Sequence, residues 1–250
     1  MKLCVSVIAL CLLLPASPAR AGWLFGGGFE HFSWVEDTAP LELKENGALF
    51  VFVAGYSWPL GERFSAEYRG RYYVGDVEYN GFLLYDPTVP VTSTTNYTGT
   101  TQQGKLRHPV TPTIDVSMGL DLDWWQRSLS TNQHEDYRIV SMRIGAEHPV
   151  SPSVPWQLGG GIKFTLSTHE NAHFDELGFD QNPALEPGQS VTPYLDVGYA
   201  FSPHWSIVGS YDGFSFGTSN DVPLSNASIS GVFYQPASDM RVFGLRLEYR

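Results

Sequence analysis

The sequence predicts an all-β chain that closes into an antiparallel transmembrane β-barrel. Three observations support this prediction: an N-terminal segment typical of exported proteins, apolar residues that alternate with polar ones in many segments, and short turns that alternate with long polar stretches. The alternation favours ten strands, and eight strands with an extended second loop is the alternative. A closed barrel pairs every backbone group within the sheet, as a bilayer requires.

The N-terminus has the pattern of a secretory signal peptide. Met1-Lys2 precedes an apolar run from Leu3 to Leu14, and a small-residue cleavage site ends at Ala21. The run is too short for a membrane-spanning helix, which needs about 20 apolar residues. We therefore expect a signal peptide over 1–21 and one barrel domain over 22–250.

The amino-acid composition excludes some classes of protein and favours a barrel. Both cysteines, Cys4 and Cys11, lie in the predicted leader, so the exported chain would contain no disulfide. Loss of Lys2 and Arg20 with the leader changes the formal charge from −11 to −13. Such an acidic chain is not expected to bind nucleic acid. Aromatic residues make up 14% of the chain while its mean hydropathy is only −0.15, and both values are typical of a barrel, whose alternation averages out.

Strand alternation is clearest in "FSAEYRGRYYV", "TIDVSMGLDLDWW" and "PWQLGGGIKFTLS", which begin at Phe64, Thr113 and Pro155. In each stretch one row is apolar and the other contains charged residues or glycine. We expect the apolar row to face lipid and the charged row to face a narrow interior, where opposite charges pair. The predicted interior charge network consists of Glu67, Arg69, Arg71, Asp115, Asp121, Asp123, Arg143, Lys163, Asp196, Asp212 and Arg246.

Extending this pattern along the chain gives ten strands, of which the fourth is Thr-rich and the weakest. Short Pro-bearing turns flanked by aromatic residues are expected on the periplasmic side, and long polar loops on the extracellular side. The expected loops cover 37–46, 80–92, 127–136, 170–190 and 218–236. The expected strands cover 26–36, 47–57, 63–78, 93–106, 112–126, 137–148, 155–168, 191–201, 204–217 and 238–249.

The last strand resembles the C-terminal assembly signal of outer-membrane barrels. Gly244, Leu247 and Tyr249 have the spacing of that signal, although Arg250 follows the aromatic residue that usually ends it. Over the whole exported chain, the pattern resembles small Gram-negative outer-membrane β-barrel proteins, the broad group of opacity, outer-membrane protein A and porin-like families. The resemblance implies a monomer in the cell outer membrane, in contact with lipid, lipopolysaccharide and, during biogenesis, the barrel assembly machinery.

Four residues deserve comparison with the enzymes of such barrels. Asp121 and Asp123 share one face of a strand, as do the paired carboxylates with which surface proteases activate water. His169 and His173 lie in "STHENAHFDE", near the end of another strand, where a hydrolase or a cation site could use them. The motifs of those enzymes are absent. We therefore expect no catalytic residues, no cofactor and no metal site.

The function expected from the sequence is a structural or surface-interaction role in the outer membrane. The charged interior leaves room for a narrow pore at most, because side chains nearly fill a barrel of this size. The alternative is a hydrolase, either a surface protease or a lipid A-modifying enzyme, that acts at the outer rim. A soluble periplasmic β-sandwich is the third interpretation.

Overall fold

The fold is known from a computed structural model. The predicted leader lies outside the described residues except for Ala21, so the signal peptide stays a prediction. Among the described residues, no helix has the length and apolar content needed to cross a membrane. The structure describes residues 21–38, 42–61, 64–83, 86–111, 113–148, 154–227 and 230–250.

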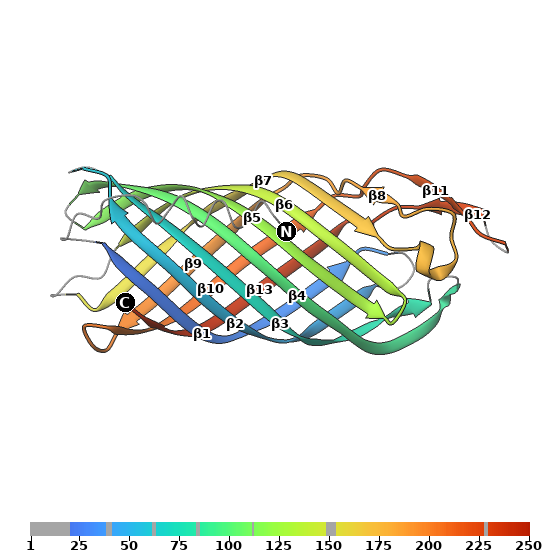
Figure 1. Cartoon of the computed structure of the whole chain (residues 1–250), viewed down its shortest axis with the longest axis horizontal. Coiled ribbons are helices and arrows are strands. Elements are labelled where there is room, and N and C mark those ends of the chain that lie inside the picture. Colours follow the sequence, from blue (N-terminus) through green and yellow to red (C-terminus); the bar gives the residue numbers. More distant parts are fainter. Residues whose placement is uncertain are drawn as a thin grey trace.

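Ten long antiparallel strands close into a barrel (Figure 1). The first strand pairs with the last over Phe25–Glu36 and Ser238–Tyr249, and β6 pairs with β7, so the sheet has no open end. The predicted ten-stranded, all-β closed barrel is confirmed. The strands are β1 (Gly22–Glu36), β2 (Leu43–Pro59), β3 (Ser65–Leu83), β4 (Asp86–Thr111), β5 (Ile114–Ser130), β6 (Gln133–His148), β7 (Trp156–Ala172), β9 (Val191–Ala200), β10 (Trp205–Phe216) and β13 (Ser238–Tyr249).

The two ends of the barrel differ. The C-terminus lies at the end where β2–β3, β4–β5, β6–β7 and β9–β10 are joined, which we call the turn end. At the opposite loop end, Figure 1 shows β11 and β12 standing beyond the barrel wall, while β8 pairs with the end of β7. A small apolar cluster that includes Phe174 and Leu224 packs β11 and β12 against the residues that follow β7. The short elements at the loop end are η1 (Asp175–Leu177), β8 (Ala184–Leu185), β11 (Val222–Ser225) and β12 (Ser230–Phe233).

Two of the expected long loops are mostly strand, and those two predictions were wrong. β3 continues to Leu83 and β4 begins at Asp86, while β5 continues to Ser130 and β6 begins at Gln133. The outward residues that lead into these stretches are polar, for example Asp76 on β3 and Gln126 on β5. An apolar–polar alternation therefore disappears although the ladder continues, and the periodicity that identifies strands is lost.

The two faces of the wall differ in chemistry as the alternation predicts. On β5, Leu122 and Trp124 point outward and are 54% and 50% exposed, whereas Asp121 and Asp123 point inward and are 0% and 5% exposed. Exposed apolar side chains surround the barrel at the same level and form an outer belt. A strand needs about 9–11 residues to cross a bilayer, and β4 has 26. The barrel wall therefore extends well beyond the belt.

Aromatic rings edge the belt at the turn end. Trp and Tyr rings prefer the level of lipid headgroups, where one end of the ring is apolar and the other is wet. This arrangement matches the aromatic edge expected next to the short turns. The paired rings are Trp23 with Tyr56 at 4.8 Å between centroids, Trp156 with Tyr199 at 4.8 Å, and Trp205 with Tyr249 at 5.1 Å.

Candidate functional site

The barrel interior holds the charged groups of the chain, beginning with a layer near the turn end. Glu67 on β3 pairs with Arg107 on β4 at 2.5 Å, and Glu147 on β6 pairs with Lys105 at 2.6 Å and with Arg107 at 2.9 Å. Glu67 also approaches Arg69 at 3.4 Å. These strands place their inward rows at the same level, so carboxylates and cations meet across the lumen. We call this group the turn-end charged layer.

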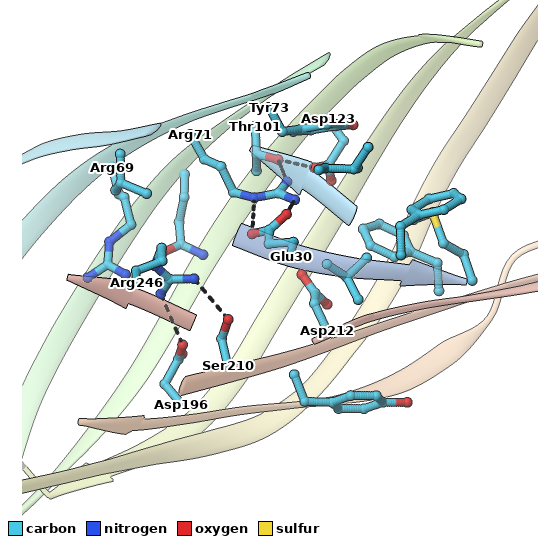
Figure 2. Close-up of a pocket in the computed structure, with 18 of the residues that line it drawn as sticks. Glu30, Arg69, Arg71, Tyr73, Thr101, Asp123, Asp196, Ser210, Asp212 and Arg246 are labelled. Carbon is cyan, nitrogen blue, oxygen red and sulfur yellow. Dashed lines mark hydrogen bonds and ion pairs between the residues drawn. The ribbon is translucent and has the colours of Figure 1, made fainter. Parts of the chain in front are cut away.

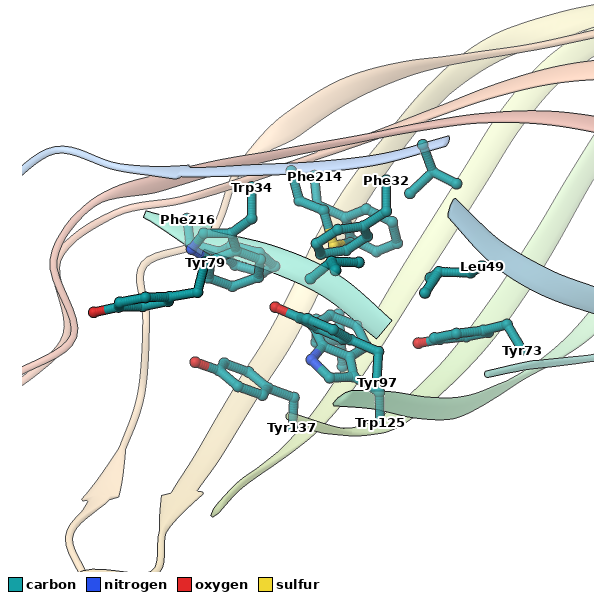
Figure 3. Close-up of a cluster of buried hydrophobic side chains, with 14 of the residues drawn as sticks. Phe32, Trp34, Leu49, Tyr73, Tyr79, Tyr97, Trp125, Tyr137, Phe214 and Phe216 are labelled. Carbon is teal, nitrogen blue, oxygen red and sulfur yellow. The ribbon is translucent and has the colours of Figure 1, made fainter. Parts of the chain in front are cut away.

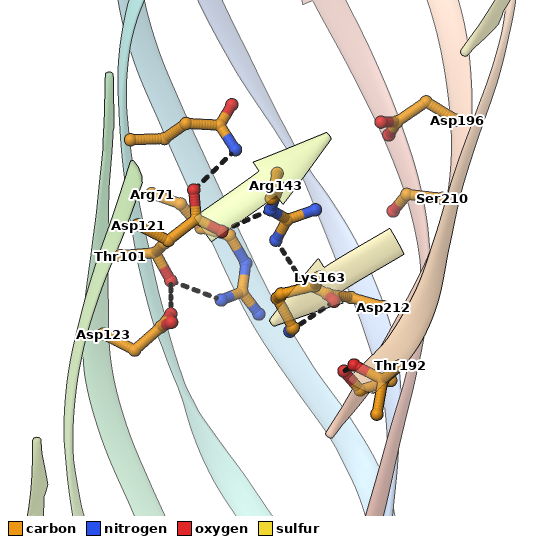
Figure 4. Close-up of polar contacts among 12 residues, drawn as sticks. Arg71, Thr101, Asp121, Asp123, Arg143, Lys163, Thr192, Asp196, Ser210 and Asp212 are labelled. Atoms are coloured by element: carbon orange, nitrogen blue, oxygen red, sulfur yellow. Dashed lines mark hydrogen bonds and ion pairs between the residues drawn. The ribbon is translucent and has the colours of Figure 1, made fainter. Parts of the chain in front are cut away.

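The next level contains two linked ion-pair groups (Figure 4). In the first, Arg143 on β6 bonds both Asp121 on β5 and, at 2.6 Å, Asp212 on β10. Lys163 on β7 is fully buried and reaches Asp212 at 2.6 Å. Asp212 thus holds two cations from neighbouring strands. Burial of these charges is tolerated because each finds an opposite charge and hydrogen bonds.

The second group centres on Arg71 of β3. Its guanidinium donates to Glu30 on β1, with Nε 2.8 Å from Oε1, and to the Thr101 hydroxyl at 3.1 Å. Thr101 in turn donates to Asp123 at 2.6 Å. Glu30, which the sequence analysis missed, is only 2% exposed.

The remaining predicted network residues lie on the same inner face. Arg246 on β13 donates to Ser210 at 2.8 Å and lies 3.7 Å from Asp196 on β9. Arg69 lies 3.8 Å from Glu248. Asp115 is half-buried at the turn end of β5 and makes no ion pair with any residue that the structure describes.

Toward the loop end the interior changes from charged to aromatic (Figure 3). Trp34 is 0% exposed and its ring centroid lies 5.8 Å from those of both Tyr137 and Phe216. Trp125 stacks on Tyr137 at 5.2 Å and meets Phe214 edge-on at 5.9 Å. We call this cluster the aromatic plug. Its members are Phe32, Trp34, Leu43, Leu49, Tyr73, Val77, Tyr79, Tyr97, Trp125, Tyr137, Ile139, Phe214, Phe216, Met240 and Val242.

Cations face the rings of the plug from both sides. Lys163 Nζ lies 3.0 Å from the centroid of the Phe214 ring, and the Arg71 guanidinium lies 4.2 Å from that of Tyr73. On the loop side, Arg127 lies 5.4 Å from Trp34. Cation–π attraction therefore joins the plug to the charged groups on either side.

A cavity of about 90 Å³ lies where the charged and aromatic regions meet (Figure 2). Arg71, Arg143 and Arg246 line it together with Asp123 and Asp212. Ligand pockets for drug-sized molecules measure about 300–1,000 Å³, whereas a cavity of this size suits a few water molecules. The interior chemistry thus fits bound water better than a substrate.

Beyond the plug, four buried carboxyl groups surround one arginine, a group that we call the acidic cluster. Arg127 is 2% exposed and reaches Glu36 at 3.1 Å, Glu45 at 3.1 Å and Glu135 at 2.9 Å. Neither carboxylate oxygen of the fully buried Glu170 has a hydrogen-bond partner within the described ranges. Sequence reasoning missed this cluster, because Arg127 and Glu135 fell inside an expected loop.

The four candidates for catalysis do not come together. Asp121 and Asp123 lie deep in the lumen and are bound to Arg143 and Thr101, rather than at the rim. β7 has one extra residue opposite the step from Val140 to Ser141 on β6, so its inward and outward rows exchange there. His169, which follows this shift, is exposed on the outer wall.

His173 lies at the loop end, 3.0 Å from Asp136. The neighbouring Glu170 points inward, opposite to His169, because successive strand residues face opposite sides. Within the described ranges, no group of three or more His, Cys, Asp or Glu side chains is arranged to hold a metal ion.

Comparisons with known proteins support the fold alone. No family model matches the chain, and no curated protein sequence matches it. Among solved structures, it is similar to the outer membrane protease OmpT from Escherichia coli, with a TM-score of 0.54, 10% identity, and coverage of 94% of this chain and 98% of that one.

Two further solved structures resemble the chain less closely. The transport unit of the autotransporter AIDA-I from Escherichia coli has a TM-score of 0.47 at 8% identity, covering 99% of this chain and 96% of that one. The attachment invasion locus protein Ail of Yersinia pestis has a TM-score of 0.38 at 12% identity, covering 91% and 96%. The fold shared with the OmpT structure is that of an outer-membrane β-barrel.

Proposed function

We propose that this chain is an integral protein of the bacterial outer membrane whose closed barrel serves a structural or surface-interaction role. One observation carries the proposal: the aromatic plug fills the lumen between two charged regions. Fifteen packed apolar side chains, several of them Trp or Tyr, give neither ions nor sugars a wet path. The expectation of a narrow pore is accordingly less well supported than a closed barrel.

The outer belt supports membrane insertion. In water, the exposed Phe, Leu, Ile and Trp side chains of the belt would form an apolar surface far larger than soluble proteins tolerate. The turn end would face the periplasm, since both strand termini at Gly22 and Tyr249 lie there. Lipid and lipopolysaccharide would surround the belt. The assembly machinery would bind the last strand, whose Leu247 and Tyr249 are exposed.

The surface role would belong to the loop end. There β11 and β12 form a two-stranded hairpin outside the barrel sheet, and Val232 and Tyr234 are 60% and 46% exposed. Phe174 and Leu224 anchor this region to the rim through their own apolar cluster. An exposed pair of strands beyond the membrane is suited to contact with a macromolecule.

A rim hydrolase is less well supported, because its candidate residues lie apart. Asp121 and Asp123 are held in ion-pair networks below the plug, and His169 is on the outer wall. The similarity to OmpT is one of fold. If hydrolysis were the function, purified protein would cleave peptide or deacylate lipid A, and Asp123→Asn would abolish that activity.

Planar-bilayer recording tests whether the plug closes the lumen to ions. We expect the refolded protein to show no steady current, and the double variant Trp34→Ala/Trp125→Ala to show one because it removes two buried rings of the plug. Trp124→Ala is the matched control, since this neighbour of Trp125 points outward and is 50% exposed. Heat-modifiable gel mobility would verify that each variant is folded. A stable ohmic current from the unaltered protein would contradict the proposal.

A further inference from the structure

The outer belt is interrupted on one strand. The outward row of β4 places Thr100, Gln102 and Gly104 at the level of the belt, and we call these three residues the polar stripe. On one side, Tyr72 of β3 pairs with Thr100. On the other side, Leu122 of β5 pairs with Gln102 and is 54% exposed. The stripe is therefore a polar strip between two apolar strands.

Polar side chains on the lipid face are unfavourable, because hydrocarbon offers them no hydrogen-bond partner. The structure satisfies them in part. Tyr68 Oη donates to Gln102 Oε1, and Gln102 Nε2 donates to Thr100 Oγ1 at 2.6 Å. A glutamine amide has two N–H donors and two acceptor lone pairs, so one donor and one acceptor position of Gln102 stay open in the described structure.

The open positions of Gln102 are self-complementary. A second copy inserted in the same orientation carries the same stripe at the same depth, so a two-fold axis along the membrane normal would bring the two amides face to face. Each amide could then donate to the other. Gly104 gives room for this approach, since a Cβ atom there would meet no atom within 4 Å.

We propose that the polar stripe is the interface through which two copies of this chain pair side by side in the membrane, with the Gln102 amides hydrogen-bonded to each other. This inference rests on the proposed membrane insertion, and it departs from the monomer expected from the sequence. A second copy is the favoured occupant because no other membrane partner is guaranteed to present matching polar groups at that depth.

Cysteine cross-linking in outer membranes of expressing cells tests the interface directly. In a background with Cys4→Ser and Cys11→Ser, oxidation of Gln102→Cys should give a covalent dimer of twice the chain mass. Leu122→Cys, one strand away, should cross-link less, and Leu247→Cys on β13 should not cross-link at all. A Gln102→Cys product with a different protein, equal yields at all three positions, or no dimer would overturn the proposal.

Sedimentation of the full protein in detergent supplies the second measurement. We expect Gln102→Leu to weaken dimerisation by about tenfold, the scale of a membrane hydrogen bond between segments, and to leave the barrel folded. Leu247→Ala is the control and should leave the dimer unchanged. A monomer for the unaltered protein, together with heat-modifiable mobility, would contradict the dimer while leaving membrane insertion intact. Loss of that mobility in the unaltered protein would instead contradict the barrel itself.

Discussion

The two halves of the barrel interior are filled by different chemistry although the same strands build both. Along β3, Arg69 and Arg71 lie in the charged half, and Tyr73 and Val77 lie in the aromatic plug a few residues later. Charged side chains can close a lumen only in matched sets, whereas aromatic side chains close it by volume. Removal of both members of a buried ion pair should therefore restore stability that removal of one member loses. Removal of a second ring from the plug should restore none.

The largest effect is expected where one cation serves several carboxyl groups. Arg127→Met would leave Glu36, Glu45 and Glu135 buried without their counterion, and should lower the free energy of unfolding by about 3–5 kcal/mol. Urea unfolding of the protein in lipid vesicles measures this. Lys44→Met, at an exposed pair with Glu42, should change stability by less than about 0.5 kcal/mol and is the control.

Removal of one ring should affect the plug almost as strongly. Trp125→Ala would leave a void among Tyr73, Tyr137 and Phe214, and should cost about 3–5 kcal/mol at any pH at which the barrel is folded. Trp124→Ala changes the same residue type one position earlier on the lipid face and should cost less. Equal losses for the two variants in urea unfolding would mean that the plug is not tightly packed.

A glycine-to-alanine change should destabilise the barrel on the inner face of β4 and leave it unchanged on the outer face. A Cβ atom at Gly99 would clash with the Tyr73 ring and lie 2.7 Å from Trp125 Cβ, so Gly99→Ala should destabilise the barrel by about 1–3 kcal/mol. Gly104→Ala, on the outer face, meets no atom within 4 Å and should be tolerated. The temperature at which each variant loses its heat-modifiable mobility would rank the two variants. The reverse ranking would mean that the face containing Gly104, and not Gly99, points inward.

The smallest effect is expected at the loop end, outside the barrel. Ser225 donates to Asp180 through its hydroxyl at 2.7 Å and its amide at 3.0 Å, and these hydrogen bonds lower the pKa of Asp180 below its ordinary value of 3.8. This contact is therefore fully formed above pH 3.8 and is lost as the pH falls through the lowered pKa. Hydrogen exchange of the Ser225 amide should accelerate there, after correction for the intrinsic rate. Asp180→Asn should exchange faster at neutral pH, with unfolding of the barrel unchanged.

Much of the barrel could be predicted from the sequence, and the reason is physical. At the level of the belt, lipid outside and charge inside produce a period of two, as in Leu120, Asp121, Leu122 and Asp123. The strands and the inward charges at this level follow from that contrast. The closure of the sheet follows because a bilayer tolerates no sheet edge.

The loop half could not be predicted in the same way, because the contrast is lost there. The inward row of β1 contains Glu30, Phe32, Trp34 and Glu36, so charge and aromatic residues share one face. The plug and the acidic cluster exist only because ten strands bring such mixed rows together. If the expected strand had continued through Arg127, the alternation would have placed Arg127 on the inward row.

A double-mutant comparison at the buried pair of Arg71 and Glu30 tests directly whether paired charge holds the charged half together. Glu30 is 2% exposed and is bound by Arg71, so Arg71→Met alone should cost about 3–5 kcal/mol in urea unfolding. Arg71→Met with Glu30→Leu should restore most of that loss, because neither member of the pair is then left as a lone buried charge. In the plug, Trp125→Ala with Phe214→Ala should be no more stable than Trp125→Ala alone. If the double change at Arg71 and Glu30 were as unstable as Arg71→Met, pairing of charge would not be what holds the charged half together.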